Sequence, residues 1–179
     1  MSVKKLVVCA MCVALAVVTN LIRIYTFPFG GSITLFSMLF IMLPAWLYGI
    51  REGVIAGLIF GILQFIIEPY FLSFIQFFLD YILAFSIMGL AGTVRNKKNG
   101  LVTGYIISVT ARWVVATFAG LAWFSAGMAL DIWKEWSPLP YSMVYNAIYI
   151  YAEAAVTVII LLIPAVRKAL DHVKSSLTS

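Results

Sequence analysis

The amino-acid sequence predicts an all-α membrane protein, a bundle of six transmembrane helices in which residues 1–179 form one domain. Of its 179 residues, 64% are hydrophobic and 11% are charged, and the mean hydropathy is +1.06. Soluble domains carry about 45–50% apolar and about 25% charged residues, so this chain has too few polar residues to cover a water-exposed surface. A spanning helix takes about 20 mostly apolar residues, and the length therefore allows roughly six or seven spans. We expect a multi-pass protein of a cell membrane, in contact with the lipid bilayer.

Six apolar runs, separated by charged residues, proline and glycine, mark the predicted spans. The first run is too long for the apolar part of a signal peptide and has no small-residue cleavage pattern after it, so it is interpreted as a span. The third run is short, which favours little tilt or locally thinned lipid. The predicted spans are residues 5–25, 33–50, 53–68, 71–94, 101–127 and 142–166.

The distribution of basic residues predicts the orientation. With the N-terminus in the cytoplasm, nine of the 12 Lys and Arg residues fall on the cytoplasmic side, Arg23 and Lys134 fall outside, and Arg112 lies within a span. The inverted topology would reverse this ratio, so the positive-inside rule places both termini in the cytoplasm. The basic residues lie at helix ends rather than in a patch with exposed aromatic side chains, so the net charge of +5 does not indicate a nucleic-acid partner.

Small residues recur at helical spacing on two of the spans. Gly53, Gly57 and Gly61 share one face of the third span. Stripes of this kind let helices approach closely in lipid, so internal packing is the favoured interpretation. Ala10 and Ala14 share a face of the first span, which either packs internally or docks a separate membrane subunit.

Three ionisable residues lie well inside the predicted spans: Asp80, Arg112 and Glu153. Each is about ten residues from a helix end, which puts it near the bilayer midplane. A charge at that depth costs roughly 2.5–3.5 kcal/mol on insertion scales, so these side chains must face an interior. One interpretation is a salt-bridged triad that only holds helices together. The other is a pocket in which one carboxylate is left for a small cation.

Polar and aromatic residues gather in the outer halves of the last three spans. An aromatic girdle at the membrane surface explains some of them, but Asn146 lies about one turn inside. Aromatic faces and a few convergent polar groups beside a carboxylate form a site for a flat organic cation. The cluster comprises Tyr70, Trp123, Phe124, Tyr141, Ser142, Tyr145, Asn146 and Tyr149.

The sequence lacks the motifs of several enzyme classes. It has no Walker A sequence and no H-E-x-x-H pattern, and its single histidine, His172, lies in the predicted cytoplasmic tail. Nothing therefore indicates a nucleotidase, a hydrolase, a bound metal or another cofactor. Six helices without an inverted repeat are few for a self-sufficient secondary transporter. If the chain transports, its energy source is expected on other subunits.

Four segments stand out by their order and spacing along the chain: G-G-S-I-T-L at 30–35, Y-G-I-R-E-G-V-I-A-G-L-I-F-G-I-L-Q at 48–64, P-Y and Q-F-F-L-D-Y-I-L-A-F within 69–85, and Y-S-M-V-Y-N at 141–146. With these segments the chain resembles the thiamine-specific S-component family of energy-coupling factor transporters, and the resemblance covers nearly the whole chain. It implies a non-enzymatic, six-helix membrane subunit that binds a vitamin near the outer face. It also implies partners, namely a transmembrane scaffold subunit and two cytoplasmic ATPase subunits.

The resemblance assigns roles to individual residues of the predicted pocket. The family's acidic ligand to the thiazolium ring falls on Asp80. Its hydrogen-bonding tyrosine and asparagine on the last helix fall on Tyr141 and Asn146. Two further pocket aromatics fall on Tyr70 and Phe124.

The resemblance also implies a contact to the scaffold subunit and includes one departure. The family's A-x-x-x-A contact falls on Ala10 and Ala14. On the fifth helix the family pattern R-x-x-x-H becomes Arg112 followed by Ala116. Because a ring that could form hydrogen bonds is missing, a related ring-bearing vitamin or precursor stays open as the ligand beside thiamine.

Two other classes of membrane protein also stay open. An autonomous secondary transporter of a small organic cation would use Asp80, Arg112 and Glu153 as a proton relay. A structural or accessory subunit would use the same three residues only to join helices, and it would bind no small molecule.

Overall fold

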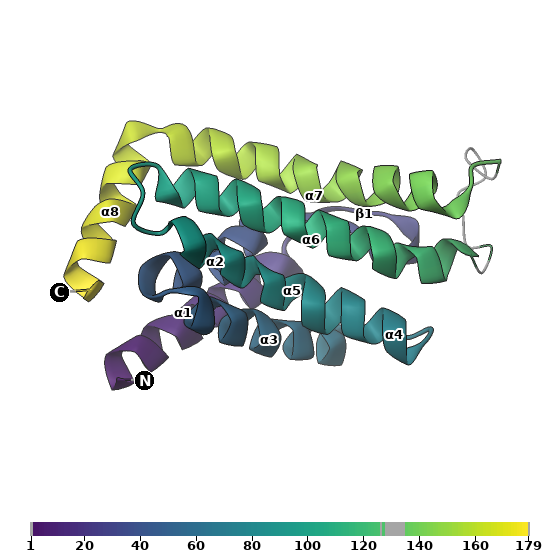
Figure 1. Ribbon diagram of the computed structural model, residues 1–179, viewed down its shortest axis with the longest axis horizontal. Coiled ribbons are helices and arrows are strands. Elements are labelled where there is room, and N and C mark those ends of the chain that lie inside the picture. Colours follow the sequence, from purple (N-terminus) through teal and green to yellow (C-terminus); the bar gives the residue numbers. More distant parts are fainter. Residues whose placement is uncertain (1, 126, 128–134, 179) are drawn as a thin grey trace.

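The computed structural model describes residues 2–125, 127 and 135–178, so Lys134 of the predicted outer loop lies outside the described residues. Both termini lie at the same end of the bundle, which we call the inner end (Figure 1). There the Lys4 amine donates to the backbone carbonyl of Ser176 at 3.0 Å. The elements are α1 (Val3–Leu21), β1 (Arg23–Thr26), η1 (Pro28–Gly30), β2 (Ser32–Thr34), α2 (Ser37–Tyr48), α3 (Ile50–Ile67), α4 (Phe74–Phe77), η2 (Phe78–Leu83), α5 (Ala84–Ser86), η3 (Ile87–Val94), α6 (Gly100–Ser125), α7 (Pro138–Leu162) and α8 (Pro164–Thr178).

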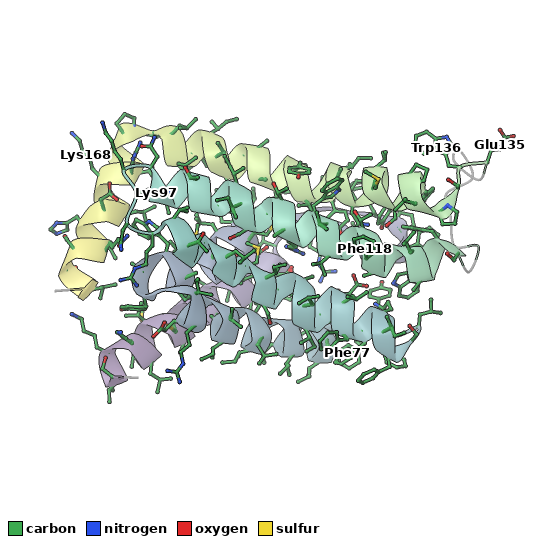
Figure 2. The ribbon with its side chains drawn as sticks, in the orientation of Figure 1. Phe77, Lys97, Phe118, Glu135, Trp136 and Lys168 are labelled. Atoms are coloured by element: carbon green, nitrogen blue, oxygen red, sulfur yellow. The ribbon has the colours of Figure 1, made fainter. Side chains whose placement is uncertain are left out.

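The helices form the predicted all-α membrane bundle. Among the described residues, five helices are long and apolar enough to cross a membrane, namely α1, α3, the continuous helix 74–94, α6 and α7, and α2 is a shorter apolar helix. α6 packs between α7 and the helix 74–94, and α3 packs against the helix 74–94, α2 and α1. Figure 2 places Lys97 and Lys168 at the inner end and Glu135 and Trp136 at the opposite, outer end.

α2 is the buried helix of the bundle. All of its 12 residues except Phe40 are buried, because it is apolar on every side. Twelve residues rise only about 18 Å, which is short of the hydrocarbon thickness of about 30 Å. The segment between α1 and α2 folds back into the outer half of the bundle as a hairpin. It occupies the part of the membrane thickness that α2 is too short to span.

Because of this hairpin, two of the predicted helix boundaries are wrong. Residues 23–26 pair with residues 32–34 as the antiparallel strands β1 and β2. The first helix therefore ends at Leu21 instead of residue 25, and the second begins at Ser37 instead of residue 33. Phe36 has a left-handed backbone with φ 64°, which a right-handed helix does not contain. The third helix, predicted to be short, has 18 residues, and the short crossing is α2.

The glycine face of α3 packs inside the bundle, as predicted. A Cβ atom added at Gly53 would lie 2.3 Å from the Cβ of Ala45 in α2. One added at Gly57 would lie 2.2 Å from the carbonyl oxygen of Phe85, and Gly61 is similarly close to its neighbours. Only glycine leaves room for these contacts, so α3 lies directly against α2 and the helix 74–94.

The last span ends earlier than predicted, and the chain continues as a further helix. α7 ends at Leu162, and the next helix starts at Pro164, a residue favoured at the first position of a helix because it has no N–H to leave unpaired. α8 then crosses the inner end of the bundle, where only a tail was predicted (Figure 1). Its apolar side chains pack against the core: Val166, Leu170 and Leu177.

α8 is also fastened by hydrogen bonds to segments far away in the sequence. Arg167 donates from its guanidinium to the backbone carbonyl of Lys98 at 2.8 Å. The Lys174 amine donates to the backbone carbonyl of Arg95 at 2.5 Å. Together with the bond from Lys4, these contacts tie α8 to α1 and to the connection between η3 and α6.

Candidate functional site

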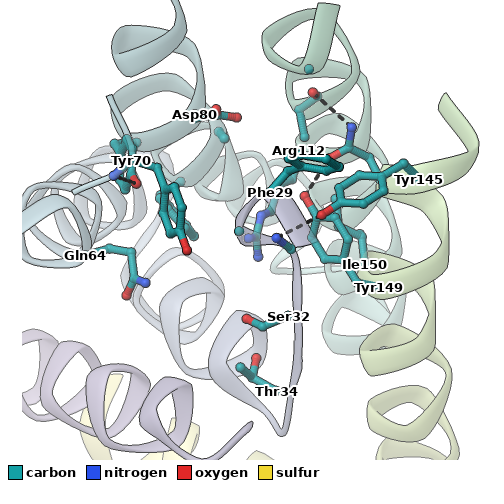
Figure 3. A pocket seen from close by; sticks show the side chains of 18 of the residues that line it. Phe29, Ser32, Thr34, Gln64, Tyr70, Asp80, Arg112, Tyr145, Tyr149 and Ile150 are labelled. Carbon is teal, nitrogen blue, oxygen red and sulfur yellow. Dashed lines mark hydrogen bonds between the residues drawn. The ribbon is translucent and has the colours of Figure 1, made fainter. Parts of the chain in front are cut away.

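A cavity of about 120 Å³ lies in the outer half of the bundle, between the hairpin segment and the helices α3, η2, α6 and α7 (Figure 3). Its lining side chains come from segments far apart in the sequence, so only the folded bundle creates it. Tyr141 and Ser142 do not line the cavity, whereas the other nine residues predicted for the pocket do: Tyr70, Asp80, Arg112, Trp123, Phe124, Tyr145, Asn146, Tyr149 and Glu153.

Asp80 supplies a fixed carboxylate to the cavity wall. It lies in η2, where the helix 74–94 widens into a π-helical turn, a feature frequent at functional sites. The Gln76 amide donates to Asp80 Oδ2 at 2.6 Å, and the Trp123 ring lies beside the carboxylate in the cavity wall. Gln76 is buried, and its Oε1 accepts from the backbone N–H of Leu72 at 3.2 Å. This bond fixes the amide with its NH₂ group toward the carboxylate.

Glu153 is held differently, because protein donors occupy both of its carboxylate oxygens. The hydroxyl of Thr34 donates to Oε2 at 2.6 Å, and the hydroxyl of Ser37 donates to Oε1 at 3.1 Å. The backbone N–H of Met38 donates to Oε1 at 3.0 Å. Glu153 on α7 therefore caps the N-terminus of α2 and holds β2 beside it, since a carboxylate at a helix N-terminus satisfies otherwise unpaired N–H groups.

The interpretation of Asp80, Arg112 and Glu153 as a salt-bridged triad is wrong. All three side chains belong to the described part of the chain, and no two of them come within salt-bridge distance. Asp80 and Glu153 instead accept hydrogen bonds from uncharged donors. The Arg112 guanidinium lies with its Cζ 4.5 Å from the centre of the Phe85 ring. Its Nε is buried and has no hydrogen-bond partner.

Asn146 joins α7 to α6 at the cavity wall. Its NH₂ group donates to the backbone carbonyls of Ala116 at 3.2 Å and Ser142 at 2.9 Å. Its Oδ1 accepts from the hydroxyl of Tyr149 at 2.5 Å. The amide thus orients the Tyr149 ring, which also lines the cavity. Ala116 lies beside it, with its methyl group in the wall where the family pattern would place a ring.

Tyr145 anchors the hairpin against α7. Its hydroxyl accepts from the backbone N–H of Gly31 at 3.1 Å and donates to the backbone carbonyl of Pro28. A Cβ atom added at Gly31 would lie 2.8 Å from this hydroxyl oxygen and 2.9 Å from Cδ1 of Tyr149. Only glycine therefore allows the hairpin to come this close to the helix.

Aromatic rings form the outer part of the cavity. The Tyr70 and Trp123 rings meet edge to face with centroids 6.3 Å apart, and the Phe29 and Phe124 rings do so at 6.4 Å. Tyr141 packs behind Phe124, with ring centroids 4.2 Å apart, and is only 1% exposed. The structure therefore places Tyr141 behind the lining, as support for the Phe124 ring.

Four polar side chains join α1, β1 and α3 at the mouth of the cavity. Asn20 donates to Gln64 Oε1 at 2.7 Å, and Gln64 donates to Glu68 Oε2 at 3.2 Å. Glu68 also forms an ion pair of 2.5 Å with Arg23. The two charges cancel, so this network adds polarity to the mouth without adding net charge.

Comparison with known proteins identifies the family. The family model described as thiamine transporter protein matches residues 6–172. The chain belongs to this family. It is 26% identical over 175 residues to the thiamine transporter ThiT of Bacillus subtilis (strain 168), covering 88% of either chain. The solved structure of ThiT from Listeria monocytogenes is similar with a TM-score of 0.72 and 26% identity, covering 88% of this chain and 90% of that one.

Membership of the thiamine transporter family confirms the sequence-based resemblance. The family consists of transporters and not of enzymes, and its apolar helices make this chain a multi-pass membrane protein.

This member of the thiamine transporter family has a second hollow, on the outer surface of the bundle between α1 and α3. It has a volume of about 260 Å³, and Ala10 and Ala14 of α1 line it together with Ile55 and Ile59 of α3. Both alanines are exposed. The small-residue face of α1 therefore does not pack inside this chain, in contrast to the glycine face of α3.

Several lining residues were missed by reasoning from the sequence. Phe29 and Thr34 reach the cavity from the hairpin, whose position no periodicity indicates. Gln64, which also lines the cavity, lies inside a predicted span. Gln76, which does not line the cavity but holds Asp80, lies inside another. Uncharged polar residues in apolar spans were a signal that could have found both.

Proposed function

We propose that this chain is the substrate-binding subunit of an ATP-driven energy-coupling factor importer and that it binds thiamine near its outer face. The observation that carries the proposal is the Asp80 carboxylate, held at a cavity wall beside the rings of Trp123 and Tyr70. Thiamine joins a positively charged thiazolium ring to an aminopyrimidine ring. A carboxylate and aromatic faces are the groups that recognise a flat cation.

The charge of the cavity supports a ligand with one positive charge. Asp80 and Glu153 carry two negative charges when ionised, and Arg112 carries one positive charge. The pair of Arg23 and Glu68 contributes nothing net. A formal charge of −1 results, and one thiazolium cation would neutralise it. Buried charges are expensive unless they are balanced in this way.

The exposed alanine face supports the proposal of partner subunits. In the proposed complex, Ala10 and Ala14 dock a transmembrane scaffold subunit, because small residues let two helices approach closely in lipid. The chain carries no Walker A sequence, so the proposed importer obtains its energy from two cytoplasmic ATPase subunits.

A related ring-bearing vitamin or precursor is a second candidate ligand, because Ala116 presents a methyl group to the cavity. Calorimetric titration of the purified protein with thiamine, its pyrimidine and thiazole halves, and pyridoxine separates the two candidates. We expect tight binding of thiamine and none of pyridoxine. Failure to bind thiamine would overturn the assignment of the ligand, and native mass spectrometry of the purified protein would then weigh the co-purified ligand.

The importer class needs its own experiment. Vesicles that contain this protein alone should not accumulate labelled thiamine. Addition of the scaffold and ATPase subunits with ATP should start uptake. Accumulation by the isolated protein would favour an autonomous secondary transporter instead.

A further inference from the structure

Arg112 lines the cavity without a direct ion pair, although the charges of Asp80 and Glu153 act on it from a longer distance. Its Nε is buried without a hydrogen-bond partner, and the described residues include no carboxylate within salt-bridge distance of it. The contact that the structure gives this guanidinium is the face of the Phe85 ring. Figure 3 shows the Arg112 side chain among the residues that surround the cavity.

The neighbouring acidic groups are already occupied by other donors. Asp80 accepts from Gln76, and Glu153 accepts from the N-terminal turn of α2 and from β2. A guanidinium has five N–H donors in a planar fork. Leaving a buried donor such as Nε unpaired is costly, and the terminal N–H groups have no acceptor among the described residues, so an acceptor atom of a ligand can bond to them.

We propose that Arg112 is a specificity-determining residue, which donates hydrogen bonds to an uncharged acceptor of the bound cation, either a ring nitrogen or a hydroxyl oxygen. This inference rests on the proposed function and names the residue that recognises the polar acceptor of the ligand. Asp80 then recognises the positive charge, and Arg112 recognises the acceptor.

The charge count favours an uncharged acceptor over an oxyanion. One cation already brings the formal charge of the cavity to zero, as the sum over Asp80, Arg112 and Glu153 requires. A phosphate on the ligand would add about 1.5 to 2 negative charges at neutral pH. The cavity would then again hold unbalanced charge.

The helix geometry leaves the guanidinium accessible to a ligand. Ala116 lies four residues after Arg112, so the two share one face of α6. Both line the cavity, and the Ala116 methyl group is too small to cover the residue one turn below. A ligand that fills the cavity can therefore reach the N–H groups of Arg112.

The test is a calorimetric cycle between Arg112 and two ligand analogues. In one analogue the hydroxyethyl group of thiamine is replaced by ethyl, and in the other a pyrimidine nitrogen is replaced by CH. Wild-type protein should bind one of the two roughly 10- to 100-fold more weakly than thiamine. Arg112→Met should bind thiamine more weakly by a similar factor and should no longer distinguish thiamine from that analogue. Arg51→Met, which removes an exposed arginine at the inner end, is the matched control and should behave as wild type.

A role of Arg112 as a mere counter-charge predicts the opposite sign. Removing a positive charge would then tighten the binding of a cation, and Arg112→Lys would bind like wild type. Either result overturns the proposal. The wild-type analogue series needs no variant to fold, and equal affinity for thiamine and both analogues would overturn it as well. Absence of any thiamine binding would instead overturn the proposed function, and this assignment with it.

Discussion

The carboxylate of Glu153 in α7 accepts a hydrogen bond of 3.0 Å from the backbone N–H of Met38 in the first turn of α2. A helix begins with N–H groups that have no partner within the helix. Inside a membrane no water is available to pair them, so another part of the protein must do so. Here the partner lies 115 residues further along the chain. Glu153 is therefore a positioning residue, which fixes α2 and the hairpin that precedes it.

Glu153→Gln should destabilise the protein. The glutamine amide keeps one acceptor oxygen but turns an NH₂ group toward donors, so at least one hydrogen bond to a charged acceptor is lost. We expect a loss of about 1.5–3 kcal/mol, visible as a lower midpoint of thermal unfolding in detergent. Glu135→Gln, at an exposed position, is the control. An unchanged midpoint in Glu153→Gln would show that the cap does not stabilise the fold.

Asp80→Asn should weaken thiamine binding while the protein stays folded. Removing one member of a desolvated charge pair typically costs about 2–5 kcal/mol, a loss of roughly 30-fold or more. Calorimetry measures this loss directly. Asp171→Asn in α8, an exposed change of the same kind, should leave the affinity intact. Equal affinity of Asp80→Asn and wild type would refute the cation site.

Gly31→Ala should reduce thiamine affinity by pushing the hairpin off α7. The backbone of Gly31 has φ −66°, which alanine also adopts, so the effect is steric. Its new methyl carbon would start 2.8 Å from the Tyr145 hydroxyl oxygen. Overpacking of this kind costs about 1–3 kcal/mol. Thr26→Ala, an exposed change in the same hairpin, should bind thiamine like wild type. Normal affinity in Gly31→Ala would mean that the hairpin adapts without loss.

Ala14→Trp should abolish thiamine uptake by cells and preserve thiamine binding by the purified protein. The indole would fill the hollow between α1 and α3 and keep a partner helix away. Leu15→Trp, on an exposed neighbouring position of α1, is the matched control and should still support uptake. Loss of binding in Ala14→Trp would show instead that this face is needed for the fold of the cavity.

The cost of burying charge located much of the candidate site from the sequence. Asp80, Arg112 and Glu153 were singled out because a charge at the midplane must face an interior, and all three line the cavity. The partners of Glu153 were not predictable, because Thr34 and Ser37 come from segments whose approach depends on tertiary packing, whereas Gln76 lies one helical turn before Asp80 on the same helix. The cost of burial thus predicts that the three charges lie inside the bundle, but not which groups they contact, and the salt-bridged triad is wrong.

Hydropathy predicted the long spans and failed where a segment is apolar without being a spanning helix. Residues 33–36 continue the apolar run of α2, although the left-handed backbone of Phe36 separates them from the helix. Hydropathy also misses α8, because the charged face of this helix lowers its mean hydropathy. Its apolar residues recur at helical spacing from Val166 to Leu177, and that periodicity could have predicted it.

The cap on α2 also sets an order of assembly. Synthesis and membrane insertion proceed from the N-terminus, so α2 enters the membrane long before the residue that caps it has been made. Until α7 is inserted, the hairpin lacks both Glu153 and the Tyr145 hydroxyl that holds Gly31. The cavity is thus completed only when α7 has left the ribosome, and a nascent chain that stops before α7 lacks this wall of the proposed binding site.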